Sequence, residues 1–322
     1  MTETTRAVFD KHEIRKTRKQ KSAFIDYVRS VSAAEGYTCK TEKGYFGARN
    51  VVVGDPDTAK VIYTAHYDTC ARLPFPNFIT PKCIWIYLLY QIVITVAMLG
   101  VPAVIVTVLY SLLQRWDPVL LYNLTVDYNA PMLLWDILVV LAMFLLMAGP
   151  ANRHTANDNT SGVTTLLDIM TALPTEARES VAFVFFDLEE MGLFGSAGFA
   201  NQHKQIAKNT LLVNFDCVSD GDTFLFALRK GSERYAQVIE KAFPATDTLK
   251  VEVVSKGVFY PSDQANFTRG VGVAALKGKG RLLYMDRIHT GRDTVYTEEN
   301  ITYLTEGAVR LAQYLSAVAD TQ

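Results

Sequence analysis

The sequence lacks an excess of charge of either sign. Its 322 residues include 32 Lys and Arg against 33 Asp and Glu, which gives a formal net charge of -1. Proteins that bind nucleic acid concentrate positive charge on one face, so this balance predicts no nucleic-acid partner. Hydrophobic residues make up 49% of the chain, which excludes a disordered polypeptide.

Cysteine is scarce as well. The chain has four cysteines, Cys39, Cys70, Cys83 and Cys217, at irregular spacings and without a Cys-x-x-Cys pair. We therefore expect reduced thiols and no disulfide framework. A basic run within residues 11–21 has no apolar stretch behind it, so we expect no cleavable signal peptide.

Charge is almost missing from one stretch of the chain, residues 84–149. The only charged residues in this stretch are Arg115, Asp117, Asp127 and Asp136. About a quarter of the remaining residues are charged, as in an ordinary soluble domain. The positive mean hydropathy of +0.11 is therefore an average over a polar domain and an apolar insert.

The insert contains two apolar runs that are long enough to cross a bilayer. Residues 84–113 contain no charge, and as a helix they would extend about 45 Å against a hydrocarbon core of about 30 Å. Residues 132–149 contain a single charged residue, Asp136, near the start of the run. Two buried core helices are the alternative, but the first run lacks the polar face of a soluble helix. We therefore predict a transmembrane hairpin that interrupts a discontinuous domain, residues 1–83 plus 150–322.

The charges beside the two runs predict an orientation. Arg72, Lys82 and Arg153 lie on the domain side, whereas Arg115 alone marks the intervening loop. Positive charge is enriched on the cytosolic side of membrane helices. We therefore predict an integral membrane protein with two transmembrane helices, a cytosolic folded domain, and the lipid bilayer as a partner through residues 84–149.

Outside the insert, strand-like runs alternate with amphipathic helical patterns. The predicted strands are residues 50–53, 60–65, 181–187, 210–218, 249–254 and 271–276, and the predicted helices are residues 12–34, 162–173, 232–243 and 298–318. This alternation is typical of an α/β protein. We predict a three-layer sandwich in which helices cover both faces of a central, mostly parallel mixed sheet.

Polar residues gather at the ends of these predicted strands. His66 and Asp68 follow one strand, where an imidazole can bind a metal and a neighbouring carboxylate can orient that ring. Glu189 and Glu190 follow another strand. Such a pair can supply one carboxylate to an ion and another to take a proton from water.

Three further segments are ambiguous when taken alone. Asp158 lies in an Asn-Asp-Asn-x-Ser-Gly segment that is equally typical of a helix N-cap. Asp216 lies in an apolar strand, where an unpaired carboxylate would be costly to bury. His289 is one of only five histidines in the chain. The order of all these motifs along the chain is a more specific signal of function than any single motif.

Taken together, these motifs resemble the co-catalytic two-zinc exopeptidase family, which includes bacterial leucyl aminopeptidases, glutamate carboxypeptidase II and glutaminyl cyclase. The motifs are His-x-Asp, Asn-Asp-Asn-x-Ser-Gly, Glu-Glu-x-Gly-Leu-x-Gly-Ser, a strand Asp and His-Thr-x-x-Asp-Thr. The resemblance covers nearly all of the chain outside the insert. It implies the zinc exopeptidase fold and two Zn²⁺ ions as cofactors.

The resemblance also implies a set of metal ligands. Asp158 would bridge the two zinc ions. His66 and Asp216 would complete the ligands of one ion, and Glu190 and His289 those of the other. Imidazole and carboxylate ligands are those that zinc prefers, so the residue types agree with the implied metal.

Further residues receive roles from the same resemblance. Glu189 would be the general base and later the acid, and Asp68 would orient the metal-binding imidazole. A Ser-Asp-Gln segment resembles a Ser-Asp-His segment of the family near the substrate pocket, with Gln264 in place of the histidine. Asp263 in that segment and Tyr260 upstream of it are candidates for contacting substrate or an oxyanion.

We therefore expect a membrane-embedded metallopeptidase, an aminopeptidase that removes N-terminal residues from peptides near the bilayer. The hairpin would hold the active site against the membrane or form a homodimer interface within it. Another amide hydrolase of the same fold is an alternative: a carboxypeptidase, an N-acyl amino acid hydrolase or a glutaminyl cyclase. A non-catalytic membrane scaffold or receptor is a further alternative, but such proteins usually lose ligands or the base, and none is missing here.

Overall fold

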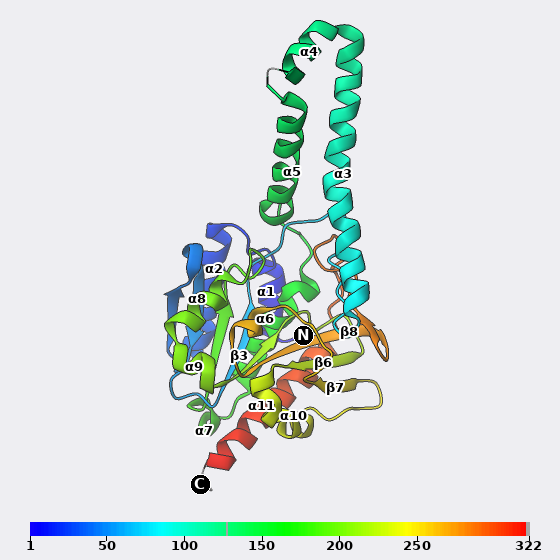
Figure 1. Ribbon diagram of the computed structural model, residues 1–322. Helices are drawn as coiled ribbons and strands as arrows, with labels where there is room; N and C mark the ends of the chain where they lie inside the picture. The colour runs from blue at the N-terminus through cyan, green and yellow to red at the C-terminus, as the bar shows by residue number, and fades with distance from the viewer. Residues whose placement is uncertain (127, 320–322) are drawn as a thin grey trace. The chain divides into compact units, whose positions relative to one another are not determined.

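The computed structural model describes residues 1–126 and 128–319, and the described chain divides into two compact units. One unit contains Met1–Ile84 and Ala151–Gln322, and the other contains Trp85–Pro150. Figure 1 shows the first unit as a sheet with surrounding helices and the second as a group of helices.

The described part of the larger unit contains one nine-stranded sheet. Its strands are β1 (Cys39–Lys43), β2 (Arg49–Val53), β3 (Val61–His66), β4 (Val181–Phe186), β5 (Leu211–Phe215), β6 (Thr223–Leu228), β7 (Lys250–Val254), β8 (Gly270–Lys279) and β9 (Leu282–Tyr284). The spatial order is β1-β2-β4-β3-β5-β8-β6-β7, and β9 pairs with β8. The four central strands β4, β3, β5 and β8 are parallel, whereas antiparallel pairs occur on both flanks. The predicted mixed sheet is confirmed, with its parallel part at the centre.

Helices cover both faces of this sheet. They are α1 (Glu3–His12), α2 (Arg18–Ala34), α6 (Gly162–Ala172), α7 (Thr175–Arg178), α8 (Phe194–Gln202), α9 (Lys204–Asn209), α10 (Ala236–Ala242) and α11 (Glu298–Ala319). Successive strand residues point to opposite faces. Tyr63 packs in the cluster formed with α1, α2, α6 and α11, whereas its neighbour Ile62 packs with Phe199 of α8 and Ile206 of α9. The three-layer sandwich predicted from the sequence is thus confirmed.

The parallel central strands determine where polar side chains meet. Every residue of β3, β4 and β5 is buried, as expected for strands that are covered on both faces. His66 at the end of β3 is level with Phe186 at the end of β4, and Thr64 is level with Asn214 of β5. The residues that follow these three strands therefore emerge at one edge of the sheet.

The helix predicted over residues 12–34 is present as α2, but it begins later, at Arg18, and the separate helix α1 precedes it. A capping box starts α2: the Thr17 hydroxyl accepts from the Gln20 amide at 3.3 Å, and the Gln20 side chain accepts from the Thr17 amide at 2.9 Å. Such a box stabilises a new helix start. Residues 232–243 divide into the turn η3 (Lys230–Tyr235) and α10.

The second unit consists of α3 (Ile84–Trp116), α4 (Pro118–Val126) and α5 (Ala130–Ala148). In Figure 1, α3 and α5 run alongside each other, and the Trp135 indole of α5 donates to the Leu99 carbonyl of α3 at 3.0 Å. The helix α4 was not predicted from the sequence. It begins at Pro118, and the side chain of the preceding residue, Asp117, accepts from the Leu120 amide at 2.9 Å. Proline at a first helical position and aspartate before it are common helix-start signals.

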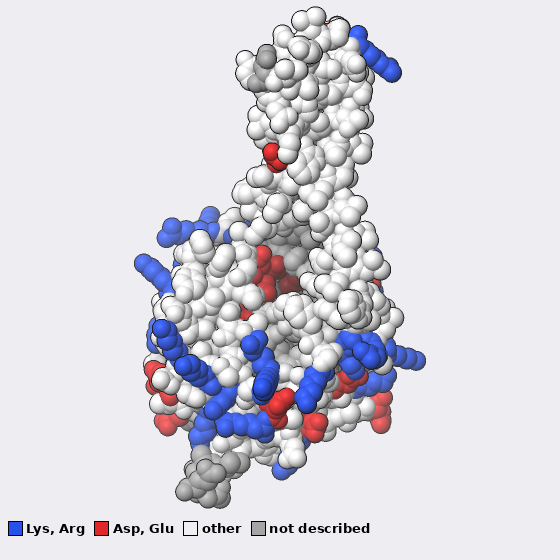
Figure 2. All heavy atoms as spheres, in the orientation of Figure 1, with Lys and Arg blue, Asp and Glu red and all other residues white. Residues whose placement is uncertain are grey.

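By length and composition, α3 and α5 can both cross a membrane. Their most apolar windows have mean hydropathies of 2.7 and 2.3, and only 11% and 6% of these windows are buried. Figure 2 accordingly shows few charged atoms over these helices, whereas many Lys, Arg, Asp and Glu side chains are scattered over the other unit. Because both helices expose their apolar side chains, neither is a core helix of the described chain.

Candidate metal centre

Six residues with metal-ligating or proton-accepting side chains lie at the carboxyl edge of the parallel strands. They are His66 at the end of β3, Asp158 in the turn η2 (Ala156–Ser161), Glu189 and Glu190 after β4, Asp216 after β5, and His289 between β9 and α11. All five predicted metal ligands and the predicted base belong to this group. Parallel strand order brings them together from segments that are far apart in the sequence.

Asp158 lies between two histidines. One of its carboxylate oxygens, Oδ1, is 3.2 Å from His66 Nε2, and the other, Oδ2, is 3.1 Å from His289 Nε2. Burial raises the pKa of this carboxyl, but hydrogen bonds with His289 and His66 outweigh it and hold the pKa below its ordinary value. Two oxygens that face different imidazoles have the arrangement of a carboxylate that bridges two cations.

Two groups of donor atoms share Asp158. One group is His66, Asp158 and Asp216, and the other includes Asp158, Glu190 and His289; within each group the ligand atoms lie within 4.8 Å of one another. Glu190 Oε2 is 3.2 Å from His289 Nε2, whereas Glu190 Oε1 is buried without a hydrogen-bond partner among the described residues. A buried carboxylate oxygen normally has a partner, and nitrogen and carboxylate donors suit zinc. The residues present therefore fit metal ions.

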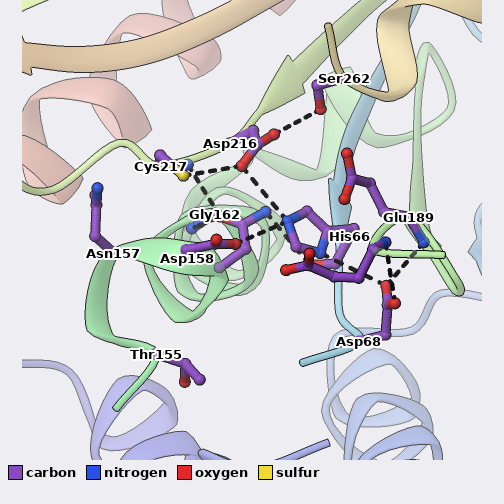
Figure 3. A network of polar contacts seen from close by, with 12 residues as sticks. His66, Asp68, Thr155, Asn157, Asp158, Gly162, Glu189, Asp216, Cys217 and Ser262 are labelled. Carbon is purple, nitrogen blue, oxygen red and sulfur yellow. Dashed lines mark hydrogen bonds and ion pairs between the residues drawn. The ribbon is translucent and has the colours of Figure 1, made fainter. Parts of the chain in front are cut away.

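Asp68, which follows β3, connects this strand to the segment after β4. Its carboxylate accepts from the Glu189 amide at 3.0 Å and from the Glu190 amide at 3.3 Å, and it lies 3.6 Å from His66 Nδ1. Burial alone would raise the pKa of Asp68. The neighbouring His66 and the Lys21 charge lower it by more, so the pKa of Asp68 lies below its ordinary value. Figure 3 shows Asp68 on the opposite side of the His66 ring from Asp158 and Asp216. Asp68 therefore holds the backbone of the glutamate pair beside His66, whereas its expected role in orienting the imidazole stays a prediction, because His66 Nδ1 has no hydrogen-bond partner among the described residues.

Glu189 differs from Glu190 in its surroundings. Both line a cavity of about 290 Å³, but Glu189 belongs to neither group around Asp158; its carboxylate lies with the ligand atoms of His66 and Glu190 in a further group of possible ligands within 4.8 Å. Burial raises the pKa of the Glu189 carboxyl well above its ordinary value, with His66 opposing and Glu190 adding to the rise. A carboxylate with a raised pKa is a stronger proton acceptor near neutral pH.

Comparison with protein-family models identifies the family of this chain. Residues 136–311, more than half of the chain, match Peptidase family M28. The chain belongs to peptidase family M28. The matched segment begins within α5 and contains Asp158, Glu189, Glu190, Asp216 and His289. His66 at the end of β3 and the supporting Asp68 precede the matched segment, and the structure brings them to the same place.

Solved structures share the fold of this M28 chain. A glutaminyl cyclase from Porphyromonas gingivalis is 14% identical with a TM-score of 0.57, over 96% of this chain and 98% of that one. A Zn-dependent exopeptidase from Parabacteroides distasonis is 15% identical with a TM-score of 0.55, over 96% of each chain. The LapA aminopeptidase of Legionella pneumophila is 14% identical with a TM-score of 0.52, over 97% of this chain and 68% of that one. A search of curated proteins found no match. Family and fold together make the chain a zinc hydrolase of the M28 type.

The Asn-Asp-Asn segment of this M28 chain does more than cap a helix. The Asn159 side chain donates to the His66 carbonyl at 3.3 Å and to the Phe215 carbonyl at 3.1 Å. The Asn157 side-chain oxygen accepts from the Ser219 amide at 2.8 Å. These bonds connect the turn that contains Asp158 to the ends of β3 and β5.

In this M28 chain, a series of side-chain hydrogen bonds holds the candidate ligand Asp216. The Thr64 hydroxyl donates to the Asn214 oxygen at 2.8 Å, the Asn214 nitrogen donates to the Ser262 hydroxyl at 2.9 Å, and Ser262 donates to Asp216 Oδ2 at 2.6 Å. Outer-shell partners of this kind fix the orientation of a metal ligand.

Sequence reasoning did not assign roles to two residues of the M28 site. The Asp293 carboxylate accepts from the Asn157 and Asp158 amides at 2.8 and 3.0 Å, and burial raises its pKa to about 8. The buried Arg15 donates to the Tyr67 carbonyl at 2.5 Å and to the Thr160 hydroxyl at 3.2 Å. Asp293 was visible within the His-Thr-x-x-Asp-Thr motif, whereas nothing distinguished Arg15 from its basic neighbours.

The segment after β7 lies beside the cavity of this M28 chain. Tyr260 lines the cavity, and its hydroxyl donates to the Asp216 carbonyl at 2.9 Å. Asp263 is fully buried outside the cavity lining, and burial raises its pKa to about 7. Gln264 donates through its side-chain nitrogen to the Tyr260 carbonyl at 2.7 Å. Contact of Tyr260 or Asp263 with substrate stays a prediction.

Proposed function

We propose that the protein is a membrane-embedded di-zinc aminopeptidase that hydrolyses the N-terminal peptide bond of peptides near the bilayer. The observation that carries this proposal is Asp158, whose two oxygens face the two histidines of separate donor groups. His66 and Asp216 would hold one ion with Asp158, and Glu190 and His289 would hold the other.

Bound zinc would polarise the scissile carbonyl and make water acidic enough to be deprotonated near neutral pH. Glu189 lines the cavity beside these ligands and takes that proton, which it then delivers to the leaving amine. Asp68 holds the backbone of Glu189 and keeps this carboxylate beside the histidine. The chain thus supplies a positioned proton acceptor and donor on the cavity side.

The lining of the cavity favours an aminopeptidase over a carboxypeptidase. No lysine or arginine is among the described residues that line it, whereas four carboxylates and two histidines of the donor groups are close together there. Binding of a substrate carboxylate commonly uses an arginine or lysine. A complete second donor group likewise favours two ions over the single zinc of a cyclase.

Assay of the zinc-loaded full chain on matched peptides tests this function. We expect release of the N-terminal residue from peptides with a free amine and no release from acetylated copies. Activity confined to the acetylated peptides would indicate an N-acyl hydrolase, and release from the other end a carboxypeptidase. Ring closure of N-terminal glutamine without loss of a residue would indicate a cyclase. No turnover with two zinc ions bound would favour a scaffold.

Cysteine labelling tests the membrane part of the proposal, in which α3 and α5 span the bilayer and the zinc domain is cytosolic. The exposed Asn123 in α4 is replaced by cysteine, with a matched Asn201→Cys variant in the exposed part of α8. We expect a membrane-impermeant maleimide to label Asn123→Cys in intact cells and Asn201→Cys only after lysis. The opposite pattern would reverse the orientation, and labelling of both in intact cells would contradict a spanning hairpin.

A further inference from the structure

A buried thiol lies against one of the two donor groups. The Cys70 sulfur is within 4.8 Å of the ligand atoms of Asp158, Glu190 and His289, so these four residues form one cluster. Cys70 is 0% exposed and is not in a disulfide. It is not among the residues that line the cavity. The sulfur therefore approaches this group from the protein interior.

Backbone contacts on both sides fix the position of Cys70. The Thr69 hydroxyl accepts from the Arg15 amide at 2.9 Å, the Cys70 carbonyl accepts from the Asn152 amide at 3.1 Å, and Ala71 pairs with Ala151 in an isolated bridge. Because Arg15 is itself completely buried, this segment has little freedom to move away from the cluster.

The surroundings of Glu190 provide a second, independent sign of a cation at this position. The Glu190 side chain is only 7% exposed, and its Oε2 lies 3.2 Å from His289 Nε2. Its other oxygen, Oε1, is buried and has no hydrogen-bond partner among the residues that the structure describes. A buried carboxylate oxygen without a donor is costly unless an ion satisfies it.

We propose that the Cys70 thiolate is a fourth protein ligand of the ion held by Asp158, Glu190 and His289. As the ion binds, the S–H bond breaks, the proton leaves to solvent, and a sulfur–metal bond forms. This inference rests on the two-metal function proposed above, and it adds a soft donor to only one of the two positions.

The proposal makes the two metal positions unequal. Four protein ligands complete the tetrahedral coordination of zinc and close a site, whereas three leave a position open for a non-protein donor. The position of His66, Asp158 and Asp216 has three, and Glu189 lies beside it in the cavity. The open position therefore belongs to the ion held by His66, Asp158 and Asp216, and the ion at Cys70 is the more tightly held of the two.

Cobalt substitution tests the assignment directly. A thiolate bound to Co²⁺ gives a charge-transfer band in the near ultraviolet, whereas visible d–d bands report the bound ion whatever its ligands. We expect the band in the unmodified full chain in detergent and its loss in Cys70→Ser, with visible bands retained. Cys217→Ser is the matched control, because Cys217 is also buried beside the centre but lies in neither donor group. It should keep the band.

Each other outcome has a defined meaning. A band that persists in Cys70→Ser, or that is missing from unmodified protein holding two cobalt ions, overturns the assignment and leaves the proposed function intact. Failure of the unmodified protein to bind any cobalt or zinc overturns both. If Cys70→Ser does not fold, cadmium NMR of the unmodified protein decides, because a thiolate ligand shifts the cadmium resonance strongly from that of an ion bound by nitrogen and oxygen only.

Discussion

Replacing Asp158 by asparagine is expected to remove zinc from both positions and to lower the hydrolysis rate by more than about 100-fold. Loss of an outer-shell partner alone costs roughly 10- to 100-fold in metal affinity or activity, and Asp158 is a direct donor shared by both groups. An amide keeps the shape of the side chain but loses its charge and one acceptor oxygen. Zinc content after dialysis and the rate of peptide cleavage measure the effect, and the unmodified protein should return close to two zinc ions per chain.

Asp168→Asn is the matched control for this change. Asp168 is an aspartate of α6, the helix that follows the Asp158 turn, and it accepts from the Thr2 and Thr4 hydroxyls at 2.8 and 3.0 Å. It is not part of a donor group. Asp168→Asn should keep both zinc ions, and an Asp158→Asn protein that also keeps both would show that the carboxylate does not bridge.

Glu189→Gln is expected to lower kcat by about 10²- to 10⁴-fold, the range typical of a lost general base, while zinc content stays at that of the unmodified protein. Glutamine preserves the length and the backbone amide that donates to Asp68, but it cannot accept a proton. Metal analysis and steady-state kinetics on one preparation measure the zinc content and kcat separately.

The neighbouring change Glu190→Gln makes the comparison sharper. Glu190 Oε2 is 3.2 Å from His289 Nε2 and belongs to a donor group, so this variant should lose one zinc ion. Near-normal turnover in Glu189→Gln would mean that another group is the base. Loss of metal in Glu189→Gln and retention in Glu190→Gln would exchange the roles of the two residues.

The central part of the fold was predictable because it is made of short, apolar, fully buried strands. β3, β4 and β5 are such runs, and the residues after them were recognised as strand ends. β1 was not predicted because its sequence, Cys39–Lys43, is mostly charged and half exposed at a sheet edge. β6 was also missed, although Thr223–Leu228 is an entirely buried apolar run, so in that case the signal was present in the sequence.

The candidate ligands were predictable because each lies in a short motif at a strand end or turn. The supporting contacts were not, because they join segments that no local pattern relates. Arg15 contacts the chain after β3 and the Asp158 turn, and Asp293 accepts from the amides of that turn more than a hundred residues earlier. Cys70 is only four residues from His66, yet its approach to His289 depends on the tertiary fold.

The bridge between Ala71 and Ala151, with the Asn152 amide donating to the Cys70 carbonyl, has a consequence for ancestry. The chain leaves and re-enters the larger unit near two paired backbone positions, so the host domain bears little loop-closure cost for the helices between them. Insertions are tolerated best where their two ends lie close together. A lineage can therefore gain, lengthen or discard an apolar helix pair between these positions at little cost to the host domain.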